Sequence, residues 1–120
     1  MTTKLRTWLL YAVAAMIAPS LGGCARAVIP GVRAAVVMKK YSITPSVIRA
    51  KQGDLVHLEV TTADVQHGFD VPTLGIKESI QPGKTANVVF RADKKGEFTV
   101  ECGVLCGPRH DDMRAKIVVE

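Results

Sequence analysis

The residues best suited to chemistry lie together near the carboxyl end of the chain. Between positions 102 and 113 the sequence holds two thiols, an imidazole and a thioether, from Cys102, Cys106, His110 and Met113. These are soft donors, and cysteine with histidines and a weakly bound methionine is typical of copper sites that transfer electrons. The segment therefore indicates an electron-transfer copper site.

One more donor is needed from elsewhere in the chain, and His67 could supply it. His67 lies in the segment 64–72, which follows a predicted strand. We expect this segment to be a polar loop, in which His67 need not be buried. The segment 102–113 should itself be a tight loop between two rigid strands, which would hold its donors in similar positions in both oxidation states.

The elements that must position these residues all read as β-structure. Residues 55–62 alternate most clearly, with Val56, Leu58 and Val60 on one face. The predicted strands cover residues 35–41, 47–50, 55–62, 85–90, 97–101 and 114–120. Short strands separated by turns rich in Gly and Pro favour an all-β sandwich or barrel.

The amino-terminal part differs in character. Lys4 and Arg6 precede an apolar run, 8–18, that would rise about 16 Å as a helix, roughly half of what a spanning helix must cross. With the small residues after it, this run predicts a secretory signal, the alternative being a buried helix of the mature fold. Leu21-Gly22-Gly23-Cys24 resembles the lipobox of bacterial lipoproteins, which predicts cleavage before Cys24 and lipidation of its thiol. A stray cysteine after a signal peptide is the alternative interpretation.

These features divide the chain into a signal peptide (1–23), a lipid-anchored tether (24–34) and a β-domain (35–120). The signal predicts export, with the protein held at a membrane by its lipid and facing the periplasm or the cell exterior. Without Lys4 and Arg6, the formal net charge falls from +5 to +3. So small a charge, with few aromatic residues, argues against a nucleic-acid partner.

The loop 102–113 resembles the Cu(A) motif of cytochrome c oxidase subunit II and of nitrous-oxide reductase, Cys-x3-Cys-x3-His-x2-Met. The stretch Asp64-Val65-Gln66-His67-Gly68-Phe69-Asp70-Val71-Pro72 is similar to the part of subunit II that carries its first histidine. The resemblance extends over about residues 41–120. It implies a cupredoxin-like Greek-key fold for the β-domain.

The resemblance also implies a role for each matching residue. The matching positions are His67, Cys102, Val104, Cys106, His110 and Met113. The two cysteines would bridge two copper ions, each histidine would bind one copper, and the methionine and the valine carbonyl would be weak ligands. Such a binuclear centre shares one unpaired electron between its metals. The implied function is one-electron transfer with redox partners such as a cytochrome c-like donor or a terminal reductase or oxidase.

The chain departs from subunit II in ways that bear on whether it is part of an oxidase. Val104 stands where subunit II usually has a glutamate that reaches toward another metal. The mature domain also lacks the two transmembrane helices of subunit II and its aromatic, acidic patch for cytochrome c. We therefore expect a free-standing Cu(A)-like electron carrier and not a subunit of a proton-pumping oxidase.

Three alternatives remain open on the sequence alone. Cys102 and Cys106 could form a disulfide, the default for paired cysteines outside the cytoplasm, but this gives no reason for the spacing of His110 and Met113. The chain could store or deliver copper, as the thioredoxin-like Sco assembly proteins do with a Cys-x3-Cys and a remote histidine. It could also be a structural lipoprotein without metal. The sequence shows no nucleophile–base pair, phosphate-binding loop or paired carboxylates, so we do not expect an enzyme in its own right.

Overall fold

The computed structural model describes residues 22–23 and 30–120. The predicted lipidation residue Cys24, the predicted signal peptide apart from Gly22 and Gly23, and residues 24–29 of the predicted tether lie outside the described residues. Residues 31–34, also predicted as tether, form the beginning of the first strand, because they pair with residues 55–58 of a neighbouring strand.

The elements of the described chain follow one another as short strands with two single-turn 3-10 helices. They are β1 (Gly31–Lys39), β2 (Ser42–Thr44), β3 (Val47–Ala50), β4 (Leu55–Thr62), β5 (His67–Val71), η1 (Pro72–Leu74), β6 (Ile76–Ile80), β7 (Ala86–Arg91), β8 (Gly96–Glu101), η2 (His110–Asp112) and β9 (Arg114–Val119). None of the described residues belongs to a helix with the length and apolar character needed to cross a membrane.

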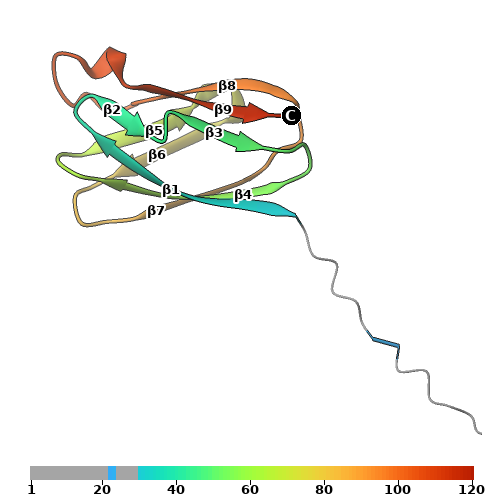
Figure 1. Ribbon diagram of the computed structural model, residues 1–120. Helices are drawn as coiled ribbons and strands as arrows, with labels where there is room; N and C mark the ends of the chain where they lie inside the picture. Colours follow the sequence, from blue (N-terminus) through green and yellow to red (C-terminus); the bar gives the residue numbers. More distant parts are fainter. Residues whose placement is uncertain (1–21, 24–29) are drawn as a thin grey trace, which may run out of the picture.

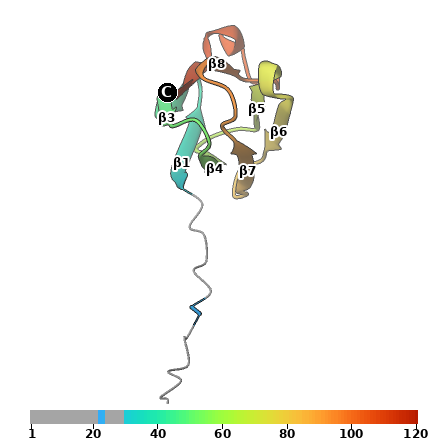
Figure 2. The ribbon, with the colours of Figure 1, turned by 90° about the vertical axis from the view of Figure 1, so that its right-hand side faces the viewer.

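The strands form two mixed sheets that pack face to face (Figure 1). One sheet has the order β2-β1-β4-β7 and the other has the order β3-β9-β8-β5-β6. β1 and β4 are parallel, as are β3 and β9, and the remaining neighbours are antiparallel. Figure 2 shows the edge strands β6 and β7 on one side of this sandwich, with β1 and β3 on the other. The predicted all-β sandwich is confirmed.

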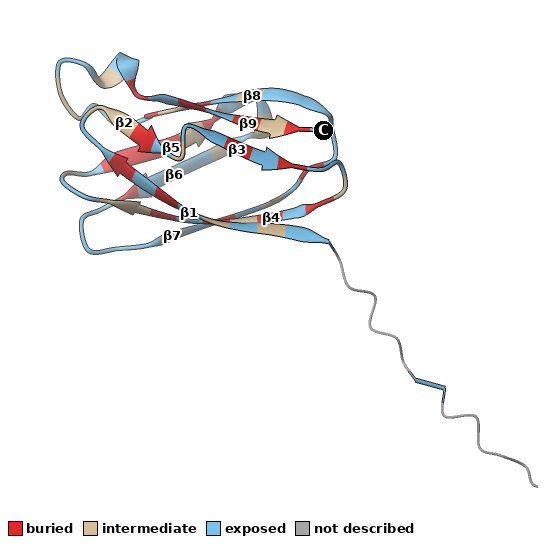
Figure 3. Cartoon of the chain, in the orientation of Figure 1, coloured by how far each residue is buried: buried red, intermediate tan, exposed pale blue. Residues whose placement is uncertain are grey.

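The core lies between the two sheets, and the period-2 alternation of the strands builds it. Val56, Leu58 and Val60 of β4 are fully buried, as the alternation predicts. Met38 of β1, in the same sheet, and Phe69 of β5, in the facing sheet, belong to the same core and are also fully buried. Figure 3 shows buried segments alternating with exposed ones along the strands, as on β1, while most of the turns are exposed.

Three strands are not predicted by the sequence, the short β2 (Ser42–Thr44) among them. The segment 64–72 was expected to be a polar loop, but it contributes β5, and residues 76–80 form the edge strand β6. β5 is paired on both sides, with β6 and with β8. Its first residue, His67, is therefore fully buried, contrary to the expectation that it need not be.

The strand ends gather at two opposite ends of the sandwich, the loop end and the base. The loop end contains the segment 101–114, the turn 81–84, the segment 39–41 and the segment 63–70, in which Asp70 lies opposite Glu101. The base contains Pro30, the turn 51–54 and the segment 91–95. Backbone hydrogen bonds of 2.8 Å from Gly53 to Ala92 and of 2.9 Å from Ala92 to Asp54 join the last two.

Candidate metal centre

The segment 102–113 is a hairpin loop whose two ends are fixed by the β8–β9 ladder. Glu101 and Arg114 form its last register pair, and the Cys102 N–H donates to the Met113 carbonyl at 3.3 Å. Inside the loop, the single turn of η2 folds the chain back, with the Met113 N–H donating to the His110 carbonyl at 3.2 Å. The predicted tight loop between two strands is therefore present.

The two thiols of this loop lie beside the imidazole of β5. The sulfur atoms of Cys102 and Cys106 are 3.9 Å apart and are not joined in a disulfide. Nδ1 of His67 lies 3.8 Å from the Cys102 sulfur. The donor atoms of these three residues all lie within 4.8 Å of one another, although His67 comes from a different part of the chain.

The other three predicted residues lie around the same sulfurs. Nδ1 of His110 is 3.9 Å from the Cys106 sulfur, and the Met113 thioether is 3.4 Å from it. The carbonyl of Val104 is 3.1 Å from the Cys102 sulfur. The structure thus brings together all six residues that the sequence singled out.

The chemistry of these donors fits a soft metal ion. Thiolate and thioether sulfurs with imidazole nitrogens favour copper over the hard cations that carboxylates bind. Met113 and His67 are fully buried and Cys102 nearly so, whereas the His110 side chain is 20% exposed. Burial raises the pKa of the Cys106 thiol, with a further contribution from Cys102 beside it. A bound metal must therefore displace protons from these thiols.

Asp64 orients His67, and sequence reasoning did not identify it. Its carboxylate lies 2.7 Å from Nε2 of His67, so that Nδ1 is the nitrogen that faces Cys102. The same carboxylate accepts the backbone N–H groups of Lys40 and Val65. Burial acts to raise the pKa of Asp64, but these two N–H groups and the His67 ring outweigh it and keep the pKa below its usual range. An aspartate three residues before a candidate histidine ligand was the signal available in the sequence.

We expect Asp64→Asn to weaken copper binding by about 10- to 100-fold, the usual cost of losing a carboxylate that holds a histidine ligand. Asparagine keeps one acceptor oxygen but loses the charge that fixes the ring. Competition titration with a copper chelator measures the affinity, and Asp93→Asn at the base is the matched control. Equal copper affinities of the two variants would show that Asp64 does not contribute to the copper site.

Gly68 lets β5 and the loop approach each other closely. Its N–H donates to the Cys102 sulfur at 3.5 Å, and its carbonyl accepts from the Gly103 N–H at 3.4 Å. A Cβ at Gly68 would stand 2.8 Å from the Gly103 nitrogen, closer than side-chain carbons come to backbone atoms. Sequence reasoning missed this contact, since a glycine after a histidine carries no distinctive signal.

Tyr41 covers the middle of the loop and leaves its tip exposed. Gly107 packs against the Tyr41 ring, where a Cβ would come within 2.6 Å of the hydroxyl oxygen. The Arg109 guanidinium lies 5.6 Å from the centroid of the same ring, within the range of a cation–π contact. Leu105, between the two cysteines, is 83% exposed. Most of the donors are thus enclosed in protein, while His110 is partly exposed.

Comparison with known proteins places these features in one family. The family model for the cytochrome C oxidase subunit II periplasmic domain matches residues 38–120. Cytochrome c oxidase subunit 2 of Cereibacter sphaeroides is 41% identical over 64 residues, 53% of this chain and 21% of that protein. Nitrous-oxide reductase of Ralstonia nicotianae is 38% identical over 76 residues, 60% of this chain and 12% of that protein. The chain therefore spans only a minor part of either relative.

A solved structure supports the same fold. The periplasmic domain of subunit II of cytochrome oxidase from Bradyrhizobium japonicum aligns with a TM-score of 0.68, covering 77% of this chain and 87% of that one. The two sequences are 23% identical over this alignment. The predicted cupredoxin-like architecture is confirmed.

Proposed function

Because the chain belongs to the family of cytochrome c oxidase subunit II periplasmic domains, we propose that it is a copper-dependent one-electron carrier. The observation that carries this proposal is the convergence of two thiols, two imidazoles and a thioether on one site beneath the loop end. Bound copper would supply the change of oxidation state, while the chain supplies the donors and fixes their positions.

The arrangement of the donors supports two metal positions. Each sulfur has its own imidazole at a similar distance, 3.8 Å between Cys102 and His67 and 3.9 Å between Cys106 and His110. Each sulfur also has one weak donor nearby, the Val104 carbonyl on one side and the Met113 thioether on the other. We propose that this paired set holds a binuclear Cu(A) centre.

The same residues would keep the site rigid when an electron arrives or leaves. The β8–β9 ladder fixes both ends of the loop, and His67 is held by Asp64 and by the pairing of β5 with β6. Donors that do not move keep the reorganisation small. Burial of Cys102 and Met113 also favours retention of the metal, which distinguishes an electron carrier from the alternative of a copper-delivery protein.

The remaining parts of the proposal concern location and partners. The family is a periplasmic domain, which supports export. We propose that a lipid on Cys24 anchors the protein, and that it exchanges electrons with a cytochrome c-like donor and a terminal oxidase or reductase.

Copper stoichiometry with electron paramagnetic resonance tests the function. We expect two coppers per chain after loading under mildly oxidising conditions, with a hyperfine pattern that reports one electron shared by two equivalent copper nuclei. The pattern of a single copper nucleus would contradict the binuclear centre and leave a mononuclear carrier. A chain that binds no copper and links Cys102 to Cys106 would contradict the function altogether.

Met113→Leu should leave copper bound and raise the reduction potential, because a weak donor to the oxidised metal is lost. Met113 is fully buried, and leucine fills a similar volume at a cost below about 1.5 kcal/mol. Metal analysis and a redox titration followed in the visible spectrum measure the two effects. Met38→Leu, at another fully buried methionine, is the control. An equal potential in both variants would show that Met113 is not a ligand.

A further inference from the structure

The described chain enters the sandwich at the base, away from the metal centre. The N–H of Leu55 donates to the Pro30 carbonyl at 3.0 Å, and β1 runs from Gly31 beside β4. Figure 1 shows this entry and the loop end at opposite ends of the molecule. An attachment to a membrane that precedes Pro30 therefore reaches the domain at its base.

The base carries four exposed cations, which we call the basal patch. The basal patch consists of Lys51, Arg91, Lys94 and Lys95. Their two segments are joined by the backbone hydrogen bonds of the base and by a bond of 2.9 Å from the Gln52 amide to the Asp93 carbonyl. None of the four forms an ion pair with another residue in the described part of the chain.

Nearby carboxylates cancel only part of this charge. Asp54 is buried and accepts the Lys51 N–H, and Glu120 is paired with Arg49 at 2.8 Å. Among the described residues of the segments that form the base, Asp93 is the exposed carboxylate. At the loop end, by contrast, cations and carboxylates are equal in number: Lys39, Lys40, Lys84, Arg109 and Arg114 against Asp64, Asp70, Glu101, Asp111 and Asp112. The positive excess of the domain therefore lies at the base.

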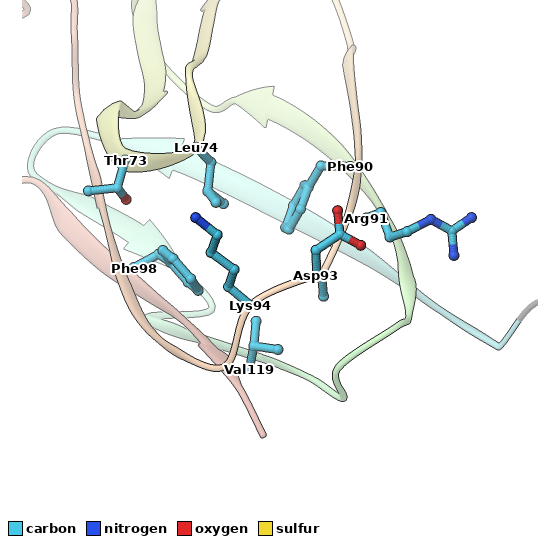
Figure 4. A pocket seen from close by; sticks show the side chains of 9 residues that line it. Thr73, Leu74, Phe90, Arg91, Asp93, Lys94, Phe98 and Val119 are labelled. Carbon is cyan, nitrogen blue, oxygen red and sulfur yellow. The ribbon is translucent and has the colours of Figure 1, made fainter.

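Lys94 combines its charge with apolar surface. Its side chain extends across an open pocket of about 300 Å³, between the rings of Phe90 and Phe98 (Figure 4). Leu74, Ala92 and Val119 complete the apolar lining. Cations beside apolar groups suit the boundary between lipid headgroups and acyl chains.

We propose that the basal patch rests on an anionic phospholipid surface, so that the loop end and its metal centre face away from the membrane. This orientation relative to the membrane rests on the proposed lipid anchor at Cys24. The residues from Cys24 to Pro30 can span at most about 25 Å, which keeps the base near the surface without setting its orientation. Electrostatic attraction acts only within about 8 Å at physiological salt, so the patch must reach the headgroups. Each cation there strengthens the contact about fivefold.

Single-tryptophan quenching tests the orientation. Cleavage before Cys24 removes Trp8, the one tryptophan of the sequence, so the exported, membrane-bound protein can carry a single probe, placed at the base as Gln52→Trp or at the loop end as Gln81→Trp. Vesicles contain phosphatidylglycerol and a phosphatidylcholine with a nitroxide on its headgroup, which quenches tryptophan near the surface. We expect the base probe to be strongly quenched and the loop-end probe to remain bright.

Charge variants test whether the basal patch causes this orientation. Removing three patch cations by Lys51→Gln, Lys94→Gln and Lys95→Gln should weaken the contact about 100-fold, so that both probes are quenched alike. Removing three loop-end cations by Lys39→Gln, Lys40→Gln and Lys84→Gln should leave the difference intact. Equal quenching of the two probes in the starting protein, or the same difference on pure phosphatidylcholine, overturns the proposal. The mass at Cys24 and the copper content report separately on the anchor and on the proposed function.

Discussion

Cys106→Ser should abolish the binuclear copper centre while the β-sandwich stays folded. The Cys106 sulfur lies 3.9 Å from Cys102, 3.9 Å from His110 and 3.4 Å from Met113, so it joins the two halves of the donor set. A serine hydroxyl is a hard, protonated donor that cannot bridge two coppers as a thiolate does. We expect copper to fall from two per chain to one or none, with loss of the shared-electron signal.

The third cysteine provides the control for this variant. Cys24→Ser makes the same chemical change at a position predicted to carry lipid and not metal. It should leave the copper spectrum unchanged and release the exported protein from the membrane. Cys106 is only half-buried, so its replacement should cost about 1 kcal/mol of unfolding free energy without copper. An unchanged copper spectrum in Cys106→Ser would show that the site is wrongly assigned.

Gly68→Ala should have the second-largest effect, because it separates β5 from the loop. The added Cβ would stand 2.8 Å from the Gly103 nitrogen and 2.9 Å from the Val104 nitrogen, and both are backbone atoms held by the loop. To relieve this overlap the loop must move outward. That movement lengthens the hydrogen bond from the Gly68 N–H to the Cys102 sulfur and the distance from His67 to the same sulfur. Overpacking of this kind costs about 1–3 kcal/mol of stability.

We therefore expect Gly68→Ala to lose copper affinity and to unfold at lower denaturant concentration even without metal. Urea unfolding of the copper-free protein and a chelator competition measure the two effects. Glu78→Ala, an exposed change on the neighbouring strand β6, controls for the effect of a substitution to alanine at this edge of the sheet. Wild-type affinity together with wild-type stability in Gly68→Ala would show that the close approach is not needed.

The sequence predicted those parts of the molecule in which local pattern and environment agree. The alternation of Val56, Leu58 and Val60 matches a strand with one buried face, and the structure has that strand. The loop 102–113 was also identified, because its donors are close in sequence and their spacing alone brings them together.

Prediction failed where tertiary contacts outweigh local composition. The residues before His67 are polar, yet β5 is buried because β6 and β8 pair with it on both sides. β6 itself has three exposed polar residues in its middle, Lys77, Glu78 and Ser79, which is typical of an edge strand and hard to distinguish from a loop. The start of β1 at Gly31 depends on a parallel partner that is 24 positions away, at Leu55. No local pattern reports such a partner.

One backbone hydrogen bond between Cys102 and Met113 closes the loop, and this bears on how the metal centre could have evolved. All but one of the six candidate ligand residues lie between these two positions, and the histidine of β5 is the exception. A short genetic exchange could therefore carry nearly the whole centre from one β-sandwich to another that already has a buried histidine beside the acceptor loop. The history of the metal centre and the history of its scaffold can then differ, and each should be traced by its own residues.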